Sequence, residues 1–177
     1  MLVPGQTVPA LVLPRVGGGI LDLHKDLASR GALLIVYRGL FCPICVKQLA
    51  AVAAQTGTFD ALNVRPMAVS ADGAEAAAEF VARAGCGGVP VGHSLSARAA
   101  HDDWGLWISP ARAGTAEPAL FAEPGLFYIN GDGTLQTAWV QSAPFARPAL
   151  DDVLGAIRFQ QEKQYAPRGT FAGSLPG

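Results

Sequence analysis

The sequence predicts an α/β domain in which a central mixed β-sheet is flanked by helices and preceded by an N-terminal β-hairpin. Two observations lead to this fold class. Apolar runs at 33–37 and 65–70 are each followed by a helical pattern, and this alternation indicates a βαβ unit with parallel strands. Hairpin patterns lie on either side of the unit, around three glycines within 8–23 and around Gly-Asp-Gly-Thr within 126–141.

The remaining elements follow from periodicity and capping residues. In chain order we expect a hairpin over 8–23, a strand over 33–37, a helix over 43–56, a strand over 65–70, a helix over 72–84, a short helix over 94–103, a long ordered loop over 108–123, a hairpin formed by 126–130 and 135–141, and a helix over 149–163. Gly57 is expected to cap the first helix, and Gly85 follows the second. We expect one domain over 1–165 and a loose C-terminal tail over 166–177, where Pro and Gly recur.

Composition narrows the function. The chain has 177 residues and is 50% apolar, which suits a single globular domain. A net charge of −1 gives no electrostatic reason to expect nucleic acid or an anionic membrane as a partner. The first residues lack a signal-peptide pattern, and no apolar run approaches the roughly 20 residues of a membrane span, so we expect a cytoplasmic location.

The most informative motif is Cys42-Pro43-Ile44-Cys45, which stands where the predicted strand gives way to a helix. Pro43 suits the first helical position, which places Cys42 at the N-cap and Cys45 in the first turn. Free N–H groups and the helix dipole favour a thiolate at the N-cap. A fall in its pKa from roughly 8.5 to about 7 would ionise about half of it at neutral pH. The spacing also allows a disulfide, so we expect Cys42 to attack and Cys45 to resolve.

Two plainer interpretations compete with a redox site. A CxxC can be half of a zinc site, but structural zinc needs a second ligand pair, and Cys86 and the three histidines form none in the sequence. Both cysteines could instead be ordinary core residues. The strand, turn, proline and helix around them favour redox chemistry, so we expect neither a metal nor a cofactor.

The segment 36–45, Val-Tyr-Arg-Gly-Leu-Phe-Cys-Pro-Ile-Cys, resembles the peroxiredoxin-like proteins of the alkyl hydroperoxide reductase/thiol-specific antioxidant superfamily. Segments 124–129 and 145–159 look like the later strand and the terminal helix of the same group. The resemblance covers most of the chain. It implies a thioredoxin-like fold and thiol-dependent reduction of peroxide.

Three positions depart from the pattern of that family. A typical member has a hydroxyl residue three positions before its attacking cysteine and a proline seven before it, where this chain has Gly39 and Ile35. The family's arginine before the Gly-Leu-Phe strand is replaced by Pro124. Arg38 and Arg147 are candidate substitutes that would bring positive charge to Cys42, and the alternative for each is an ordinary surface or helix-flanking arginine.

Pro124 also lies near the place where thioredoxins keep a cis-proline that faces the CxxC motif. In that case Pro124, Pro43 and Phe41 would line a groove for a substrate or partner. Cys86 is expected to be structural, and His93 and His101 to be polar surface or loop residues.

Trp104 and Trp107 precede the predicted long loop and could line the active-site cleft, although core packing is the favoured interpretation.

The sequence thus favours an atypical two-cysteine, peroxiredoxin-like peroxide reductase. One alternative is a thioredoxin-like protein disulfide reductase, and another is a non-enzymatic redox sensor or binding module. The expected partners are a peroxide or a protein disulfide, a thioredoxin- or glutathione-type reductant, and a second copy of the chain in a homodimer.

Overall fold

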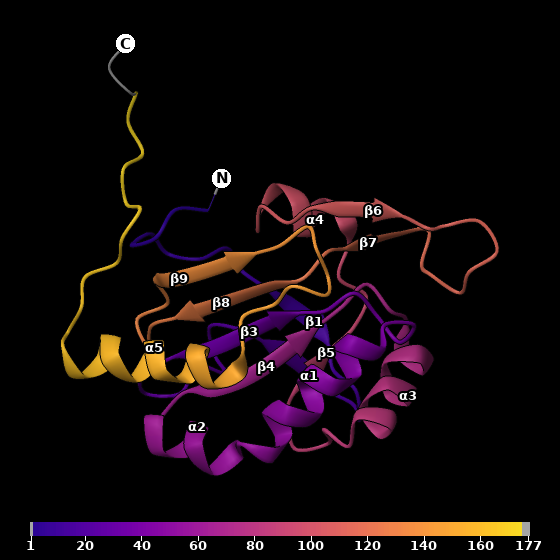
Figure 1. The fold of residues 1–177 in the computed structure, drawn as a ribbon, viewed down its shortest axis with the longest axis horizontal. Coiled ribbons are helices and arrows are strands. Elements are labelled where there is room, and N and C mark those ends of the chain that lie inside the picture. The colour runs from indigo at the N-terminus through magenta and orange to yellow at the C-terminus, as the bar shows by residue number, and fades with distance from the viewer. Residues whose placement is uncertain (1, 175–177) are drawn as a thin grey trace.

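A five-stranded sheet forms the centre of the computed structural model, which describes residues 2–174 (Figure 1). Its strands, in spatial order, are β5 (Val91–Gly92), β4 (Arg65–Val69), β3 (Ala32–Val36), β8 (Gly125–Ile129) and β9 (Leu135–Val140). β3, β4 and β5 run parallel, whereas β8 is antiparallel to β3, and β9 is antiparallel to β8. The predicted α/β fold with a central mixed sheet is therefore confirmed.

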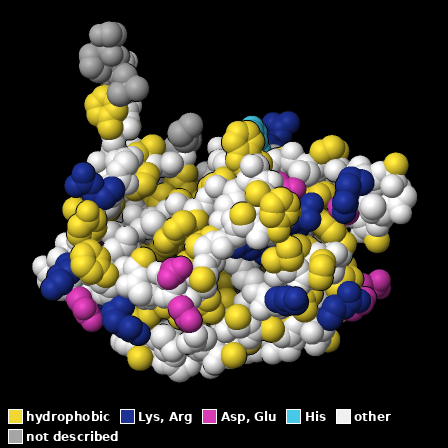
Figure 2. Space-filling view, in the orientation of Figure 1, with side chains coloured by type: hydrophobic (Ala, Val, Ile, Leu, Met, Phe, Trp, Pro, Cys, Tyr) yellow, Lys and Arg dark blue, Asp and Glu magenta, His cyan; other side chains and the backbone are white. Residues whose placement is uncertain are grey.

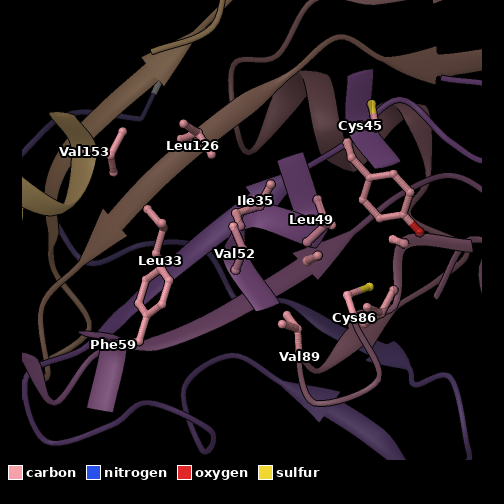
Figure 3. Packing of buried hydrophobic residues seen from close by; sticks show 14 of the residues in the cluster. Leu33, Ile35, Cys45, Leu49, Val52, Phe59, Cys86, Val89, Leu126 and Val153 are labelled. Atoms are coloured by element: carbon pink, nitrogen blue, oxygen red, sulfur yellow. The ribbon is translucent and has the colours of Figure 1, made fainter. Parts of the chain in front are cut away.

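Helices cover the sheet unequally on its two faces. They are α1 (Pro43–Ala54), α2 (Thr56–Leu62), α3 (Ala74–Ala84), α4 (Ala97–Asp102) and α5 (Leu150–Glu162). β3 is buried on both sides because its residues alternate between two cores. Leu33 and Ile35 pack with α1, α2, α3 and α5, as Figure 3 shows in part, whereas Leu34 and Val36 pack with α4 and the N-terminal segment. This double burial explains why β3 reads as a continuous apolar run.

The N-terminal hairpin is present as predicted. It consists of β1 (Val12–Pro14) and β2 (Ile20–Asp22), which are antiparallel. The terminal hairpin of β8 and β9 and the helix α5 also lie where the sequence places them. Residues 166–174 form neither a helix nor a strand, and the end of the predicted tail, 175–177, lies outside the described residues.

Two predictions about local structure are wrong. The segment predicted as a long loop contains a second small hairpin, in which β6 (Ile108–Pro110) pairs with β7 (Leu120–Ala122). Strands of three residues are too short to show a clear alternation in the sequence. Gly57 does not end α1: that helix ends before Gln55, and Gly57 lies inside α2. Burial of Phe59 and Leu62 on the next turn outweighs the weak helix propensity of one glycine.

Among the residues the structure describes, no helix is both long and apolar enough to cross a membrane.

Candidate active site

The two thiols of the CxxC motif lie together at the start of α1. Cys42 is the N-cap residue, in an extended conformation, and Pro43 occupies the exposed first helical position. The backbone N–H of Cys45 donates to Cys42 Sγ across 3.3 Å. The sequence prediction for this turn is therefore confirmed: the sulfur of Cys42 takes the place of the usual capping oxygen.

Cys45 directs its thiol toward Cys42. Its Sγ donates to Cys42 Sγ across 2.7 Å, and neither cysteine is in a disulfide. Both side chains are buried, with Cys42 2% and Cys45 0% exposed. A disulfide between them would need only a small further approach of the sulfurs.

The pKa values of the two thiols move in opposite directions. The pKa of Cys42 falls to about 5, chiefly because the Cys45 thiol donates a hydrogen bond to its sulfur. Burial opposes the fall, while the Cys45 N–H and the positive charges of Arg147 and Arg38 add to it. Burial, and next its role as donor to Cys42, raises the pKa of Cys45. These opposite shifts favour a thiolate on Cys42 and a thiol on Cys45.

Arg147 contacts both sulfurs. It lies in the segment between β9 and α5, far from the CxxC motif in sequence. Its Nη2 is 3.2 Å from Cys45 Sγ and 3.6 Å from Cys42 Sγ. Its other nitrogens are also engaged, since Nε donates to the carbonyl of Pro144 across 2.7 Å and Nη1 donates to Gln48 Oε1. Arg147 thus supplies fixed positive charge beside the Cys42 thiolate.

Arg38 has a different environment. Its Nε lies 3.0 Å from Glu123 Oε2, as an ion pair without hydrogen-bond alignment, and its Nη2 lies 3.9 Å from Glu117 Oε1. The guanidinium also lies over the rings of Phe41 and Phe121, which pack against each other, at about 5 Å from each ring centroid. Arg38 therefore fastens the β6–β7 hairpin to the turn before Cys42, and it acts on Cys42 only through its charge.

The turn that carries Cys42 rests on a buried carboxylate that sequence reasoning missed. Asp72, which is 4% exposed, follows β4 and accepts a hydrogen bond from Leu40 N across 2.9 Å and another from Ser70 Oγ across 3.2 Å. A Cβ on Gly39 would lie 2.7 Å from Asp72 Oδ1, and Gly39 has a φ of +144°. Glycine is therefore required where the family has a hydroxyl residue. The sequence contained one signal for this role of Asp72, because the residue comes soon after a parallel strand and so lies at the same edge of the sheet at which β3 ends.

The three residues of the predicted partner groove have different surroundings. Pro124 is buried and precedes β8, whose first residue pairs with Val36, so it lies at the same end of the sheet as the turn before Cys42. No peptide bond among the described residues is cis, so the resemblance of Pro124 to a thioredoxin cis-proline is wrong. Phe41 packs against Phe121 instead of opening a groove.

A mostly apolar cavity of about 320 Å³ lies on the far side of Arg147 from the two thiols. Its wall includes Lys47, Gln48 and Arg147. Apolar side chains complete it: Leu33, Ile35, Ile44, Val52, Leu126, Phe145, Leu150 and Val153 are among them. Figure 2 shows the side of the molecule that α1 and α5 cover, on which hydrophobic side chains reach the surface between scattered charges. Neither cysteine lines this cavity, and Arg147 is the residue that contacts both the cavity and the two sulfurs.

The remaining candidates lie apart from the dithiol. Cys86 is fully buried, and burial raises the pKa of its thiol. Trp104 packs against Phe127 in the core as expected, whereas Trp107 is 59% exposed, which contradicts its placement in the core. His101 is exposed. No cluster of three His, Cys, Asp or Glu side chains suited to a metal occurs in the described part of the chain.

His93 is half-buried, and its ring contacts the hydroxyl of the neighbouring Ser94.

Solved structures similar to this one include peroxiredoxins. A mutant of peroxiredoxin 6 from Arenicola marina matches with a TM-score of 0.76 and 18% identity, over 100% of this chain and 81% of that one. The peroxidoxin BcpB of Mycobacterium tuberculosis matches with a TM-score of 0.70 and 20% identity, over 90% and 98%. Prx3 of Vibrio vulnificus, solved in complex with hydrogen peroxide, gives 0.72 and 19%, over 89% and 99%. The thioredoxin-like fold of the peroxiredoxins is therefore confirmed.

Among proteins of curated function, none matches this sequence. The family comparison is decisive, because the model of the AhpC/TSA family matches residues 4–138, which is more than half of the chain. That match includes β3, the CxxC motif and β8, whereas Arg147 lies beyond the matched residues. The chain belongs to the AhpC/TSA family.

Proposed function

We propose that this protein is a thiol-dependent peroxidase of the atypical two-cysteine kind, in which Cys42 reduces the peroxide and Cys45 of the same chain resolves it. One observation carries the proposal. The Cys42 sulfur accepts hydrogen bonds from the Cys45 thiol and N–H and lies beside Arg147, an arrangement that favours a thiolate at neutral pH. The family and its structural relatives support peroxide as the oxidant.

The chemistry runs in three steps. The Cys42 thiolate attacks one peroxide oxygen, an S–O bond forms, the O–O bond breaks, and the leaving oxygen takes a proton. Cys45 then gives up its proton, and its sulfur attacks the sulfenic sulfur of Cys42, which releases water and leaves a disulfide. A thioredoxin- or glutathione-type reductant supplies the two electrons and two protons that restore the dithiol.

Disulfide exchange is the second candidate, and one observation favours it. Gly39 and Pro124 replace the hydroxyl and arginine that the family uses to orient the peroxide, whereas attack of a thiolate on a disulfide does not need these two groups. In the peroxidase proposal, Arg147 and Arg38 supply the missing positive charge.

Rapid mixing of the reduced protein with hydrogen peroxide, followed by tryptophan fluorescence, separates the two. We expect a fast change that is absent in Cys42→Ser. A rate no greater than that of a free thiol, combined with rapid reduction of a small disulfide, would assign the site to disulfide exchange.

A non-enzymatic redox sensor would instead turn over slowly and bind a protein partner differently in its two oxidation states. Pull-downs with the reduced and the oxidised protein test this, and equal binding in both states would exclude it. Sedimentation over a range of concentrations tests the expected homodimer.

A further inference from the structure

The guanidinium of Arg147 is held from three directions. Nη2 faces the two sulfurs, Nε donates to the Pro144 carbonyl within its own segment, and Nη1 donates to Gln48 Oε1. Apart from the thiols themselves, Gln48 is the one of these partners that belongs to α1. Gln48 therefore joins the segment before α5 to the reactive helix.

The position of Gln48 on α1 explains this contact. It follows Cys45 by three residues, so the two side chains lie on the same side of the helix, one turn apart. A side chain here can reach an arginine that itself reaches the thiols, and the half-buried setting of both residues shields the contact from water. The carbonyl of Pro144 cannot do the same, because it would move together with Arg147.

We propose that Gln48 is the positioning residue that holds Arg147 against the two sulfurs and so keeps its positive charge beside the Cys42 thiolate. Gln48 does not contact the reacting atoms itself. The inference rests on Cys42 as the nucleophile of the proposed function, but not on the choice between peroxide and disulfide.

Three other groups act on Cys42 and have to be kept constant in any test. They are Cys45 on the same helix, Arg147 from the segment between β9 and α5, and Arg38 from the turn before α1. A change at Gln48 leaves all three residues in the sequence and alters only how Arg147 is held.

The chain offers a matched control at the other end of the same helix. Gln55, the C-cap residue of α1, also bridges toward α5, with its Nε2 donating to Asp151 Oδ1 across 3.0 Å. Gln48→Met and Gln55→Met each remove one amide that ties this helix to the C-terminal part of the chain. Methionine is similar in length to glutamine and has good helix propensity. Only the first removes the contact to Arg147.

The test is a double-mutant cycle in which the pKa of Cys42 is measured from the ultraviolet absorbance of its thiolate as the pH is changed. The absorbance step that is absent in Cys42→Ser is assigned to Cys42. We expect Gln48→Met to raise the pKa of Cys42 by about 1, a tenfold loss of thiolate at low pH, and Gln55→Met to leave it unchanged. In an Arg147→Met background, Gln48→Met should add no further shift.

Two outcomes would overturn the proposal. No shift in Gln48→Met would mean that Arg147 keeps its position without Gln48, and an equal shift in both backgrounds would mean that Gln48 acts by another route. Thermal unfolding of each variant identifies a folding defect, and Gln48→Ala provides a second truncation if Gln48→Met is unstable. Because the readout needs no peroxide, failure of the peroxidase assay would not affect it.

Discussion

The carboxylate of Asp72 occupies the space that a side chain on Gly39 would need, with 2.7 Å between Asp72 Oδ1 and the position of a Cβ. The backbone of Gly39 adds to the restriction, because its φ of +144° is rarely adopted by other residues. The family's hydroxyl residue therefore cannot be restored at this position without moving the turn that holds Cys42.

We expect Gly39→Ser to destabilise the protein by about 1–3 kcal/mol, because it combines backbone strain with a steric clash. We also expect it not to increase the peroxide rate. Gly57→Ala is the control, since Gly57 lies in α2 with open space around it, and it should stabilise by up to about 1 kcal/mol. Urea unfolding measures both. Wild-type stability in Gly39→Ser would show that Asp72 can yield.

Replacing each of the two cysteines should stop the reaction at a different step. Cys42→Ser removes the attacking sulfur and should abolish the reaction altogether. Cys45→Ser keeps the thiolate but lacks the resolving thiol, so it should accumulate a sulfenic acid on Cys42 that a dimedone-type reagent traps. Intact-mass spectrometry after one equivalent of peroxide distinguishes the products, and labelling of Cys45 in Cys42→Ser would reverse the assignment.

Acidity should control both the reaction and the stability of the reduced protein. The pKa of Cys42 falls from an ordinary 9.0 to about 5, so the rate with peroxide should decrease as the pH falls through about 5. Because the pKa of Cys42 is lower in the folded than in the unfolded protein, its ionisation stabilises the folded state when the pH is above the unfolded-state pKa. This contribution to the free energy of unfolding is lost as the pH falls from about 9 to about 5. The free energy of unfolding should therefore decline over that range more in the wild type than in Cys42→Ser, and parallel curves would contradict the shift.

The two arginines should behave differently when each is replaced by Met. Arg147→Met removes charge from the sulfurs and should raise the pKa of Cys42, and it should lower the free energy of unfolding only by the linked amount, about 1.4 kcal/mol for a pKa that rises by one. Arg38→Met leaves the buried carboxylate of Glu123 without its charged partner, which should cost about 3 kcal/mol, whereas Glu117 keeps its ion pair with Arg112. Thiolate titration and urea unfolding, applied to both variants, check the contrast. A large loss of stability in Arg147→Met would make it a structural residue.

Local signals in the sequence were sufficient for the reactive turn and most of the sheet. Pro43 after a buried strand fixes the helix start, and therefore the place of Cys42 as the N-cap residue and of Cys45 in the first turn. The β8–β9 hairpin follows in the same way from its Gly-Asp-Gly-Thr turn.

Contacts between distant segments could not be predicted. Whether Arg147 reaches the sulfurs depends on how the segment before α5 packs on α1, and the contact from Gln48 depends on the same packing. The carboxylate of Asp72 reaches the backbone of Leu40 only because β4 lies beside β3. The hairpin of β6 and β7 was missed because its strands are short and its closing contacts run through buried Glu117 and Glu123.

The short approach of Cys45 to Cys42 also affects survival under oxidative stress. A sulfenic acid on Cys42 has two fates: a neighbouring thiol captures it, or a second peroxide carries it irreversibly to the sulfinic acid. Here the capturing sulfur stands 2.7 Å away on the same helical turn, so capture requires no unfolding of α1 and no second molecule. The protein should therefore remain active through many turnovers at peroxide concentrations that would inactivate an enzyme whose second thiol has to travel.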